Sequence, residues 1–326
     1  MNEPTVSRNL STELPLKKTP EVMTGILNID KPSGMTSFQI VALVKRLSGE
    51  RRVGHAGTLD PIATGVLPVC LGQATRVVEF LSEARKTYLA KIELGIATDT
   101  YDITGQVTQR GDTSTIDRER LEAALTSFRG LIRQTPPMYS AVKYQGKPLY
   151  KLARAGITVE RQSREAQIYS LELLDWQSPV ATIEVVCGKG TYIRSIAHDL
   201  GQTLGCGASL RSLARLKYGC FDIKDALSIS HLEDAFRYGY WPELVYPLDS
   251  VLADWEAVVI GNDAEEDMKM GRPLILAGEK MPATEPLLSD SILEKRCRTY
   301  TLDGRFVGVL RFNPVSGGWH PEKVLL

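Results

Sequence analysis

Apolar and polar residues alternate most regularly over residues 86–94, where Tyr88, Ala90, Ile92 and Leu94 share one side of an extended chain. This period of two predicts a β-strand with one buried face. Shorter apolar runs predict further strands at 25–30, 65–71, 167–174 and 181–187.

Helical spacing of apolar residues begins soon after the first predicted strand. Apolar residues between 40 and 47 lie on one side of a helix that ends at Gly49, and Thr36 and Gln39 have the spacing of a capping box. Similar patterns predict helices at 73–82, at 121–128 before Gly130, at 193–204 and at 264–270. The mixture of strands and helices places the chain in the α/β (α+β) class.

Composition divides the chain into segments. Residues 1–23 are polar, contain three prolines and show no period, which predicts a disordered N-terminal tail. We expect a main domain over 24–250, whose last part, 222–250, is acidic and helix-rich. A small second domain is expected over 251–326, where Asp303-Gly304 joins two alternating runs and predicts a hairpin.

The glycine-rich stretch 53–76 carries the first candidate for chemistry. Gly54 and Gly57 permit unusual backbone angles and Pro61 fixes its own φ, so Asp60 lies on a stiff loop backed by the 65–71 strand. A carboxylate held on a rigid loop is a common way to present a reactive group. The alternative is an ordinary Asp-Pro turn, in which Asp60 bonds its own backbone.

Arg194 is a second unusual position, because it lies in the first turn of the helix predicted at 193–204. A cation there opposes the helix dipole, at a cost of roughly 0.3–1 kcal/mol. A local rule broken in this way points to a functional site. Arg194 therefore needs an anion, which is either a carboxylate or a phosphate.

Residues 134–164 are the least regular part of the main domain and interleave tyrosines with cations, as in Tyr139, Lys143, Tyr144 and Lys147. Residues 131–220 hold 12 Lys+Arg against 6 Asp+Glu, whereas 221–270 hold 3 against 12, so a polyanion would be drawn to the first segment. Basic segments with aromatic residues suit looped RNA, whose unstacked bases need flat partners. An ordinary solvated hairpin is the alternative for 134–164.

Composition also limits the kind of protein, its cellular location and its use of metals. A chain of 326 residues with 43% hydrophobic residues and no net charge suits a globular protein with a large core. No apolar run approaches the roughly 20 residues of a membrane span. Five dispersed cysteines indicate reduced thiols, and hence a cytoplasmic protein. The four histidines show no metal-binding spacing, so we expect neither a metal nor a cofactor.

Four motifs give the chain a family resemblance. The stretch from Gly54 matches GHxGxLDPxAxGxLPxxxGxAT at every fixed letter, and DKPxGxTS, PxMYSAxKxxGxxLYxxAR and GTYIR are also present. The chain resembles the bacterial-type tRNA pseudouridine-55 synthases, the B family of pseudouridine synthases. The resemblance implies a mixed, largely antiparallel central sheet with flanking helices. It also implies that 134–164 is an RNA-binding insertion and that 251–326 is a small, β-rich, PUA-like RNA-binding domain.

The resemblance assigns three catalytic residues. It implies that Asp60 is the nucleophile, that Arg194 is its ion-pair partner, and that Tyr88 stacks on the target base. Without the resemblance, Tyr88 would be interpreted as a core residue of its strand.

Further residues are expected to contact the substrate. His55 is expected to occupy the space that a flipped base leaves, although a bond to the glycine-rich backbone would also explain it. The resemblance implies that Leu213 lines the uracil pocket, and Tyr192 belongs to the GTYIR motif beside Arg194. In the insertion, Lys143 and Lys147 are expected to contact RNA.

Formation of pseudouridine breaks a C–N glycosidic bond and makes a C–C bond to the same ribose, without redox chemistry. A carboxylate achieves this by adding to ribose C1′ or to uracil C6, and the sequence does not decide between them. Hydrolysis would require two carboxylates, whereas Asp60 is the one strong candidate. Isomerisation therefore fits better than hydrolysis. The resemblance implies that the substrate is a base in the T stem-loop of tRNA, which must be flipped out of the loop, and we expect a monomer that needs no guide RNA and no membrane.

Two rival classes are distinguishable. A non-catalytic RNA-binding or tRNA chaperone protein on the same fold would not need Asp60, Tyr88 and Arg194 together. The guide-RNA-dependent archaeal and eukaryotic relatives share the catalytic core, but they lack an insertion such as 134–164 and work with partner proteins. Activity on a naked tRNA transcript would separate the three classes.

Overall fold

The computed structural model describes residues 23–276 and 295–325. The tail predicted for 1–23 lies outside this range except for Met23, and so does the part of the second domain between 277 and 294.

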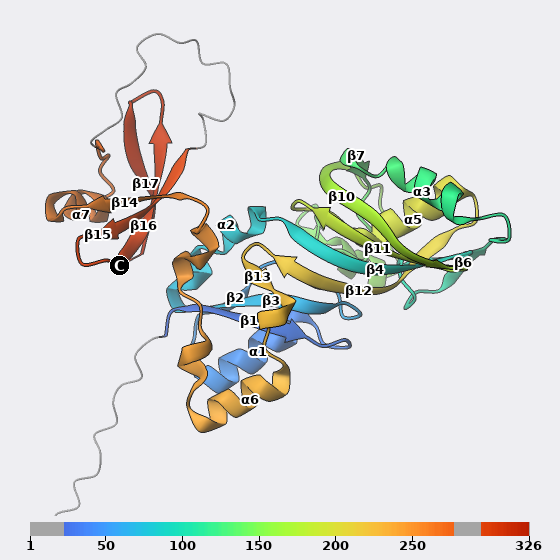
Figure 1. Cartoon of the computed structure of the whole chain (residues 1–326), viewed down its shortest axis with the longest axis horizontal. Helices are drawn as coiled ribbons and strands as arrows, with labels where there is room; N and C mark the ends of the chain where they lie inside the picture. Colours follow the sequence, from blue (N-terminus) through green and yellow to red (C-terminus); the bar gives the residue numbers. More distant parts are fainter. Residues whose placement is uncertain (1–22, 277–294, 326) are drawn as a thin grey trace, which may run out of the picture.

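A mixed sheet forms the centre of the main domain, in the order β1-β3-β12-β4-β11-β10-β7, with β2 paired to β3 and β13 to β12 (Figure 1). The β3–β12 pair is parallel, and the other pairs are antiparallel, as expected from the family resemblance. The strands are β1 (Gly25–Lys31), β2 (Val53–His55), β3 (Thr64–Leu71), β4 (Lys86–Leu94), β7 (Gly130–Gln134), β10 (Arg164–Gln177), β11 (Val180–Cys187), β12 (Ala208–Tyr218) and β13 (Phe221–Asp222).

The strand β4 shows the alternation that its sequence predicts. Its even-numbered residues from Lys86 to Leu94 are buried, and most belong to the main hydrophobic core. Tyr88 is paired with Val185 of β11 on one side and with Arg215 of β12 on the other. Because both edges of β4 are hydrogen-bonded to neighbouring strands, the position and direction of the Tyr88 side chain are fixed by the sheet.

Helices flank the sheet at both ends (Figure 1). The first helix begins with the predicted capping box, in which the Thr36 side chain accepts from Gln39 N, and it ends at Gly49 in the left-handed conformation. The α-helices of the main domain are α1 (Ser37–Ser48), α2 (Val78–Glu83), α3 (Arg118–Thr126), α4 (Leu149–Arg154), α5 (Ile193–Leu204) and α6 (Ile229–Tyr238). Short 3-10 turns occupy Gly72–Arg76, Ile223–Asp225, Trp241–Leu244 and Leu248–Leu252.

Three predicted helices differ from the structure in their bounds, and one of them, predicted at 264–270, spans 262–269. Segment 73–82 is a 3-10 turn followed by α2 rather than one helix. The helix predicted at 121–128 starts earlier, because the Asp117 carboxylate accepts from Arg120 N and caps it. That helix also ends earlier, and Gly130 begins β7 instead of ending a helix.

Residues 134–164 contain little regular structure, as their composition predicts. A short hairpin of β8 (Lys143–Tyr144) and β9 (Lys147–Pro148) precedes α4, and Arg164 is already the first residue of β10. A second hairpin, of β5 (Ile96–Thr98) and β6 (Val107–Arg110), follows β4 and encloses the loop 99–106.

The C-terminal part forms a separate sheet in the order β14-β15-β16-β17 (Figure 1). Its elements are β14 (Glu256–Ile260), α7 (Asn262–Lys269), β15 (Arg296–Thr301), β16 (Phe306–Asn313) and β17 (Gly318–Val324). The predicted hairpin at Asp303-Gly304 joins β15 and β16. The sheet packs on the segment around α2, where the rings of Phe80 and Trp255 meet edge-on at 5.2 Å and Arg76 Nη1 donates to Val324 O at 2.7 Å.

Within the described ranges, no helix is both long and apolar enough to cross a membrane.

The parallel contact between β3 and β12 predicts a strong effect at Gly65. Gly65 has φ +97 and pairs with Arg215, and a Cβ at Gly65 would overlap the Arg215 carbonyl and lie 2.9 Å from its amide nitrogen. We expect Gly65→Ala to lower the free energy of unfolding by roughly 2–5 kcal/mol, since left-handed strain and overpacking add. Chemical denaturation measures this change.

Gly34→Ala is the matched control, because Gly34 also has a positive φ, of +86, but nothing lies within 4 Å of the position that a Cβ would take there. It should show only the backbone strain, about 1 kcal/mol. Equal losses in the two variants would contradict the close approach at Gly65.

Candidate active site

A pocket of about 1120 Å³ brings together segments that are far apart in the sequence. Its walls come from the loop before β3, from β4 and β12, from the loop 99–106, from the insertion and from the start of α5. Five of the sequence-predicted site residues line it together with Asp60: His55, Tyr88, Tyr192, Arg194 and Leu213.

The loop that carries Asp60 is held by the segment 31–37. The Ser37 hydroxyl donates to Leu59 O at 3.1 Å and accepts from Leu59 N at 2.9 Å. The carbonyl of Pro61 accepts from Gly34 N at 2.8 Å and from Lys31 Nζ at 3.4 Å. Bonds on both sides of Asp60 therefore fix its backbone, and the DKPxGxTS motif acts as a clamp on the loop.

Asp60 and Arg194 form a two-pronged ion pair. Arg194 Nε lies 2.9 Å from Asp60 Oδ2, and Arg194 Nη2 donates to Asp60 Oδ1 at 3.0 Å. The Arg194 side chain is 5% exposed, whereas that of Asp60 is 34% exposed. The arginine is thus buried behind the carboxylate, which opens to the pocket. The anion that Arg194 needs is a carboxylate, and the carboxylate of Asp60 is engaged by Arg194 rather than by a simple turn.

Further contacts use the remaining N–H groups of the Arg194 guanidinium. Nη2 also donates to Tyr139 O at 2.9 Å, and Nη1 donates to Thr100 O at 3.3 Å. Nη1 lies 3.7 Å from Asp102 Oδ2 as well. Arg194 therefore ties together the loop of Asp60, the loop 99–106, the insertion and α5.

Opposing effects act on the acidity of Asp60. Burial raises the pKa of Asp60 above its ordinary value, and the neighbouring Asp102 charge adds to that rise. The charge and the hydrogen bond of Arg194 oppose the rise. The ionised form of Asp60 thus depends on Arg194 more than it would at the protein surface.

Tyr88 lies against a buried arginine. Arg215 is 1% exposed, and it donates from Nε to Val66 O at 2.7 Å and from Nη2 to Gly57 O at 3.0 Å. Burial raises the pKa of Tyr88, while the charge of Arg215 and a hydrogen bond from it act in the opposite direction. Tyr88 is therefore a neutral phenol beside the guanidinium of Arg215.

The remaining predicted contacts inside the pocket come from three elements. His55 ends β2, and burial together with the Arg215 charge lowers its pKa, so its imidazole is neutral. Leu213 lies on β12 opposite Ala90. Tyr192 is the N-cap residue of α5, and its amide donates to Gln134 Oε1 at 3.1 Å.

Lys143 and Lys147 are not brought into the pocket. They lie on the exposed hairpin of β8 and β9. The insertion contributes other residues to the pocket wall, including Tyr139, Tyr150 and Arg154.

Sequence reasoning missed Arg215 and Asp102. Arg215 lies two residues after Leu213 in a strand, and this spacing places both on one face, so the signal was present. Asp102 lies in the loop 99–106, and its nearness to Arg194 depends on a fold that brings residues 102 and 194 together.

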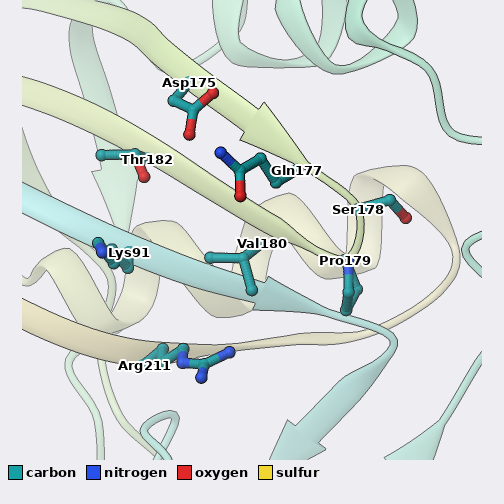
Figure 2. A pocket seen from close by; sticks show the side chains of 8 residues that line it. All are labelled: Lys91, Asp175, Gln177, Ser178, Pro179, Val180, Thr182 and Arg211. Carbon is teal, nitrogen blue, oxygen red and sulfur yellow. The ribbon is translucent and has the colours of Figure 1, made fainter.

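Another pocket, of about 360 Å³, shares no lining residue with the first (Figure 2). It lies over β4, β10, β11 and β12, and its charged residues are Lys91, Asp175 and Arg211. Arg211 already pairs with Glu93 at 3.6 Å. Among the described residues, no group of three or more His, Cys, Asp or Glu side chains could hold a metal ion in either pocket or elsewhere.

Comparison with known proteins identifies the family. The family model described as "TruB family pseudouridylate synthase (N terminal domain)" matches residues 45–193, and "tRNA pseudouridylate synthase B C-terminal domain" matches 194–259. A protein of Dehalococcoides mccartyi named "tRNA pseudouridine synthase B" is 44% identical over 93% of this chain and 97% of its own length. One of Clostridium kluyveri with the same name is 39% identical over 88% of this chain and 95% of its own length.

The chain belongs to the tRNA pseudouridine synthase B family. Members of the family are isomerases that act on uridine in tRNA. The predicted family, enzyme class and mixed sheet are therefore confirmed.

Solved structures agree with the fold. "Crystal Structure of a Cbf5-Nop10-Gar1 Complex" matches with a TM-score of 0.70 and 27% identity, over 93% of this chain and 85% of that chain. "Structure of H/ACA RNP bound to a substrate RNA containing 2'-deoxyuridine" matches with a TM-score of 0.67 and 24% identity, over 93% and 85% respectively.

The contacts of Arg215 predict that Arg215→Lys loses both stability and rate. A lysine keeps the charge but lacks the planar fork with which Arg215 donates to the carbonyls of Val66 and Gly57, so the free energy of unfolding should fall by about 1–3 kcal/mol. The rate of pseudouridine formation should also fall, because the Tyr88 hydroxyl and the Gly57 backbone lose their support. Denaturant titration and single-turnover kinetics on a tRNA transcript measure the two effects.

Arg211→Lys is the control on the same strand, since Arg211 is half exposed and its ion pair with Glu93 spans 3.6 Å. A surface pair of this kind contributes about 0–1 kcal/mol, so this variant should resemble the wild type. If Arg215→Lys also matched the wild type in rate, Arg215 would have no part in positioning Tyr88.

Proposed function

We propose that this chain, acting alone, converts the uridine at position 55 of the tRNA T loop to pseudouridine, with Asp60 as the nucleophile. The observation that carries the proposal is the two-pronged pair of Asp60 and Arg194 in a pocket that also contains Tyr88. A non-catalytic RNA-binding protein would have no use for an ionisable carboxylate opened to a pocket and backed by a buried arginine.

The chemistry requires one nucleophile and no net change in atoms. The Asp60 carboxylate adds to ribose C1′ or to uracil C6, the C1′–N1 bond breaks, and the base rotates before C1′ bonds to C5. The bond from Asp60 to C1′ breaks as C1′ bonds to C5, or the bond from Asp60 to C6 breaks afterwards, and the carboxylate is released. The C5 proton then leaves and N1 gains a proton, so product and substrate are isomers. Arg194 keeps Asp60 ionised while the base covers the pocket and excludes water.

The other pocket residues receive the target base once it is flipped out of the loop. Tyr88 stacks on the uracil, and its hydroxyl, beside the guanidinium of Arg215, is a candidate for moving the C5 proton. Leu213 and Tyr192 give the base an apolar and an aromatic neighbour. Flipping leaves a gap in the RNA loop, which the neutral imidazole of His55 fills.

Two further parts of the chain hold the RNA. The insertion 134–164, with Lys143 and Lys147 on its exposed hairpin, closes over the loop from one side. The C-terminal sheet β14–β17, docked on α2, serves as a PUA-like domain that contacts the tRNA beyond the T loop.

We further propose that the enzyme is a cytoplasmic monomer that needs no guide RNA. Cys70 and Cys187 are buried free thiols, which suits a reducing compartment. A tRNA transcript without guide or partner proteins is therefore the substrate for the decisive assay.

Substitution of the ion pair tests the proposal. Asp60→Asn is nearly isosteric, and Arg194 keeps its bonds to Thr100 O and Tyr139 O, so the variant should fold and bind tRNA but form no detectable pseudouridine. Arg194→Lys keeps the charge but loses the fork, and it should lose at least about 100-fold in single-turnover rate with binding largely intact.

Asp175→Asn, in the pocket of Figure 2, makes the same carboxylate-to-amide change outside the site and should retain full activity. Substantial turnover by Asp60→Asn would remove Asp60 from the role of nucleophile. If Arg194→Lys abolished binding but spared the chemical step, Arg194 would be a phosphate contact instead.

The proposed role of the insertion predicts an ionic contribution from its hairpin. The double variant Lys143→Gln/Lys147→Gln should weaken tRNA binding and reduce the slope of log affinity against log salt by about 1–2, because two phosphate contacts are lost. Binding titrations at several salt concentrations measure this slope.

Lys224→Gln/Arg237→Gln removes two exposed cations from the acidic segment 222–250 and should leave the slope as it is in the wild type. An unchanged slope in the hairpin variant would assign 134–164 a role other than phosphate binding.

A further inference from the structure

The solvent face of α1 has an unusual composition. The helix buries Ile40, Val41, Leu43 and Val44 in the core. Its opposite face exposes an aromatic side chain, a small residue and two cations at the spacing of one helix face: Phe38, Ala42, Lys45 and Arg46.

The side chain of Phe38 is exposed and does not pack in the hydrophobic core. Its side chain is 75% exposed, which leaves a large apolar ring in water. Phe38 is also one of the residues that line the pocket of Asp60. Because this ring does not pack in the core and lies at the edge of the substrate pocket, it can contact a ligand.

The backbone at Phe38 is held in place relative to the loop of Asp60. Phe38 follows Ser37, whose hydroxyl bonds both the amide and the carbonyl of Leu59. The capping box of Thr36 and Gln39 fixes the first turn of α1. The start of α1 is therefore joined to the loop of Asp60 by hydrogen bonds, and the backbone of Phe38 has a fixed position relative to the pocket.

The charges along α1 favour a polyanion. The helix contains no Asp or Glu, and Lys45 and Arg46 are exposed about two turns beyond Phe38, roughly 10 Å along the axis. The exposed Arg51 and Arg52 follow the end of the helix. An aromatic ring at the pocket with cations leading away from it suits single-stranded RNA, because bases stack on the ring while phosphates meet the cations.

We propose that this face of α1 is a second RNA-contact surface, in which Phe38 stacks on an unpaired base beside the target uridine and Lys45 and Arg46 bind the adjoining phosphates. The proposal rests on the tRNA isomerase function proposed above. Phe38 is thereby a positioning residue for the RNA loop, on the side of the pocket formed by α1 and separate from the insertion 134–164.

Substitutions on α1 should separate stacking from charge. Phe38→Ala should weaken tRNA binding between about 5- and 100-fold without changing the salt slope, because a stacking contact carries no charge. The same loss should appear in kcat/KM, with a smaller loss in single-turnover rate at saturating enzyme. Phe38→Trp should retain binding, since it offers a flat aromatic surface. Lys45→Gln/Arg46→Gln should reduce the salt slope by about 1–2.

Tyr238→Ala on α6 is the matched control. Tyr238 is 72% exposed, close to the value for Phe38, but its helix carries Glu233 and Asp234. The Phe38→Ala variant places a strong helix former at an exposed position, so it should keep the stability of the wild type.

The outcomes distinguish this inference from the function on which it rests. If the wild type forms pseudouridine but Phe38→Ala binds tRNA as tightly as Tyr238→Ala does, the α1 surface is not an RNA contact. The proposal is equally overturned if Phe38→Ala is wild-type in every RNA assay yet disrupts a complex with another protein. If the wild type forms no pseudouridine on tRNA, the proposed function fails first, independently of Phe38.

Discussion

A buried guanidinium needs anions and carbonyls on every side, and the arrangement of the active site follows from how this need is met at Arg194. The side chain lies at the start of a helix, where the dipole disfavours a cation. Asp60 neutralises it through two short contacts, and the carbonyls of Thr100 and Tyr139 accept its other hydrogens. Four segments distant in sequence must therefore meet at one point, and the pocket forms where they meet.

The scaffold keeps this meeting point rigid. Ser37 and Lys31 hold the backbone on either side of Asp60, while Arg215 reaches from β12 to the carbonyls of Gly57 and Val66. The approach of β12 to β3 at Gly65 makes this reach possible. The backbone that carries the reacting carboxylate is thus held by hydrogen bonds between buried side chains and main-chain groups, so it tolerates little movement.

Local sequence patterns predicted those parts of the site that depend on interactions between residues close together in the sequence. The alternation around Tyr88 predicted a central strand, and the glycines and proline around Asp60 predicted a stiff loop. The cation against the helix dipole predicted that Arg194 needs an anion, and the family motif supplied Asp60 as that anion. The partners that lie far away in sequence were not foreseen, because a guanidinium such as that of Arg215 gives no sign in the sequence of which carbonyls it will reach.

The sequence also did not predict where individual surface residues would lie relative to the pocket. Lys143 and Lys147 stood in a basic, aromatic segment, yet they lie on a hairpin outside the pocket, while Phe38 reaches the pocket from a helix that looked ordinary. Composition indicates that a segment is suited to RNA, but the side of the pocket on which each residue lies depends on the fold.

The dependence of Asp60 on Arg194 is tested most directly by the pH dependence of the single-turnover rate in the wild type and in Arg194→Gln. The reactive form of Asp60 is ionised, so the rate should fall as the pH drops through the pKa of Asp60, which burial holds above the ordinary value of 3.8. Loss of the guanidinium removes the main effect that lowers this pKa, so the acid limb of Arg194→Gln should move to higher pH as its maximal rate falls. An acid limb at the same pH in both proteins would contradict the ion pair as the device that keeps Asp60 reactive.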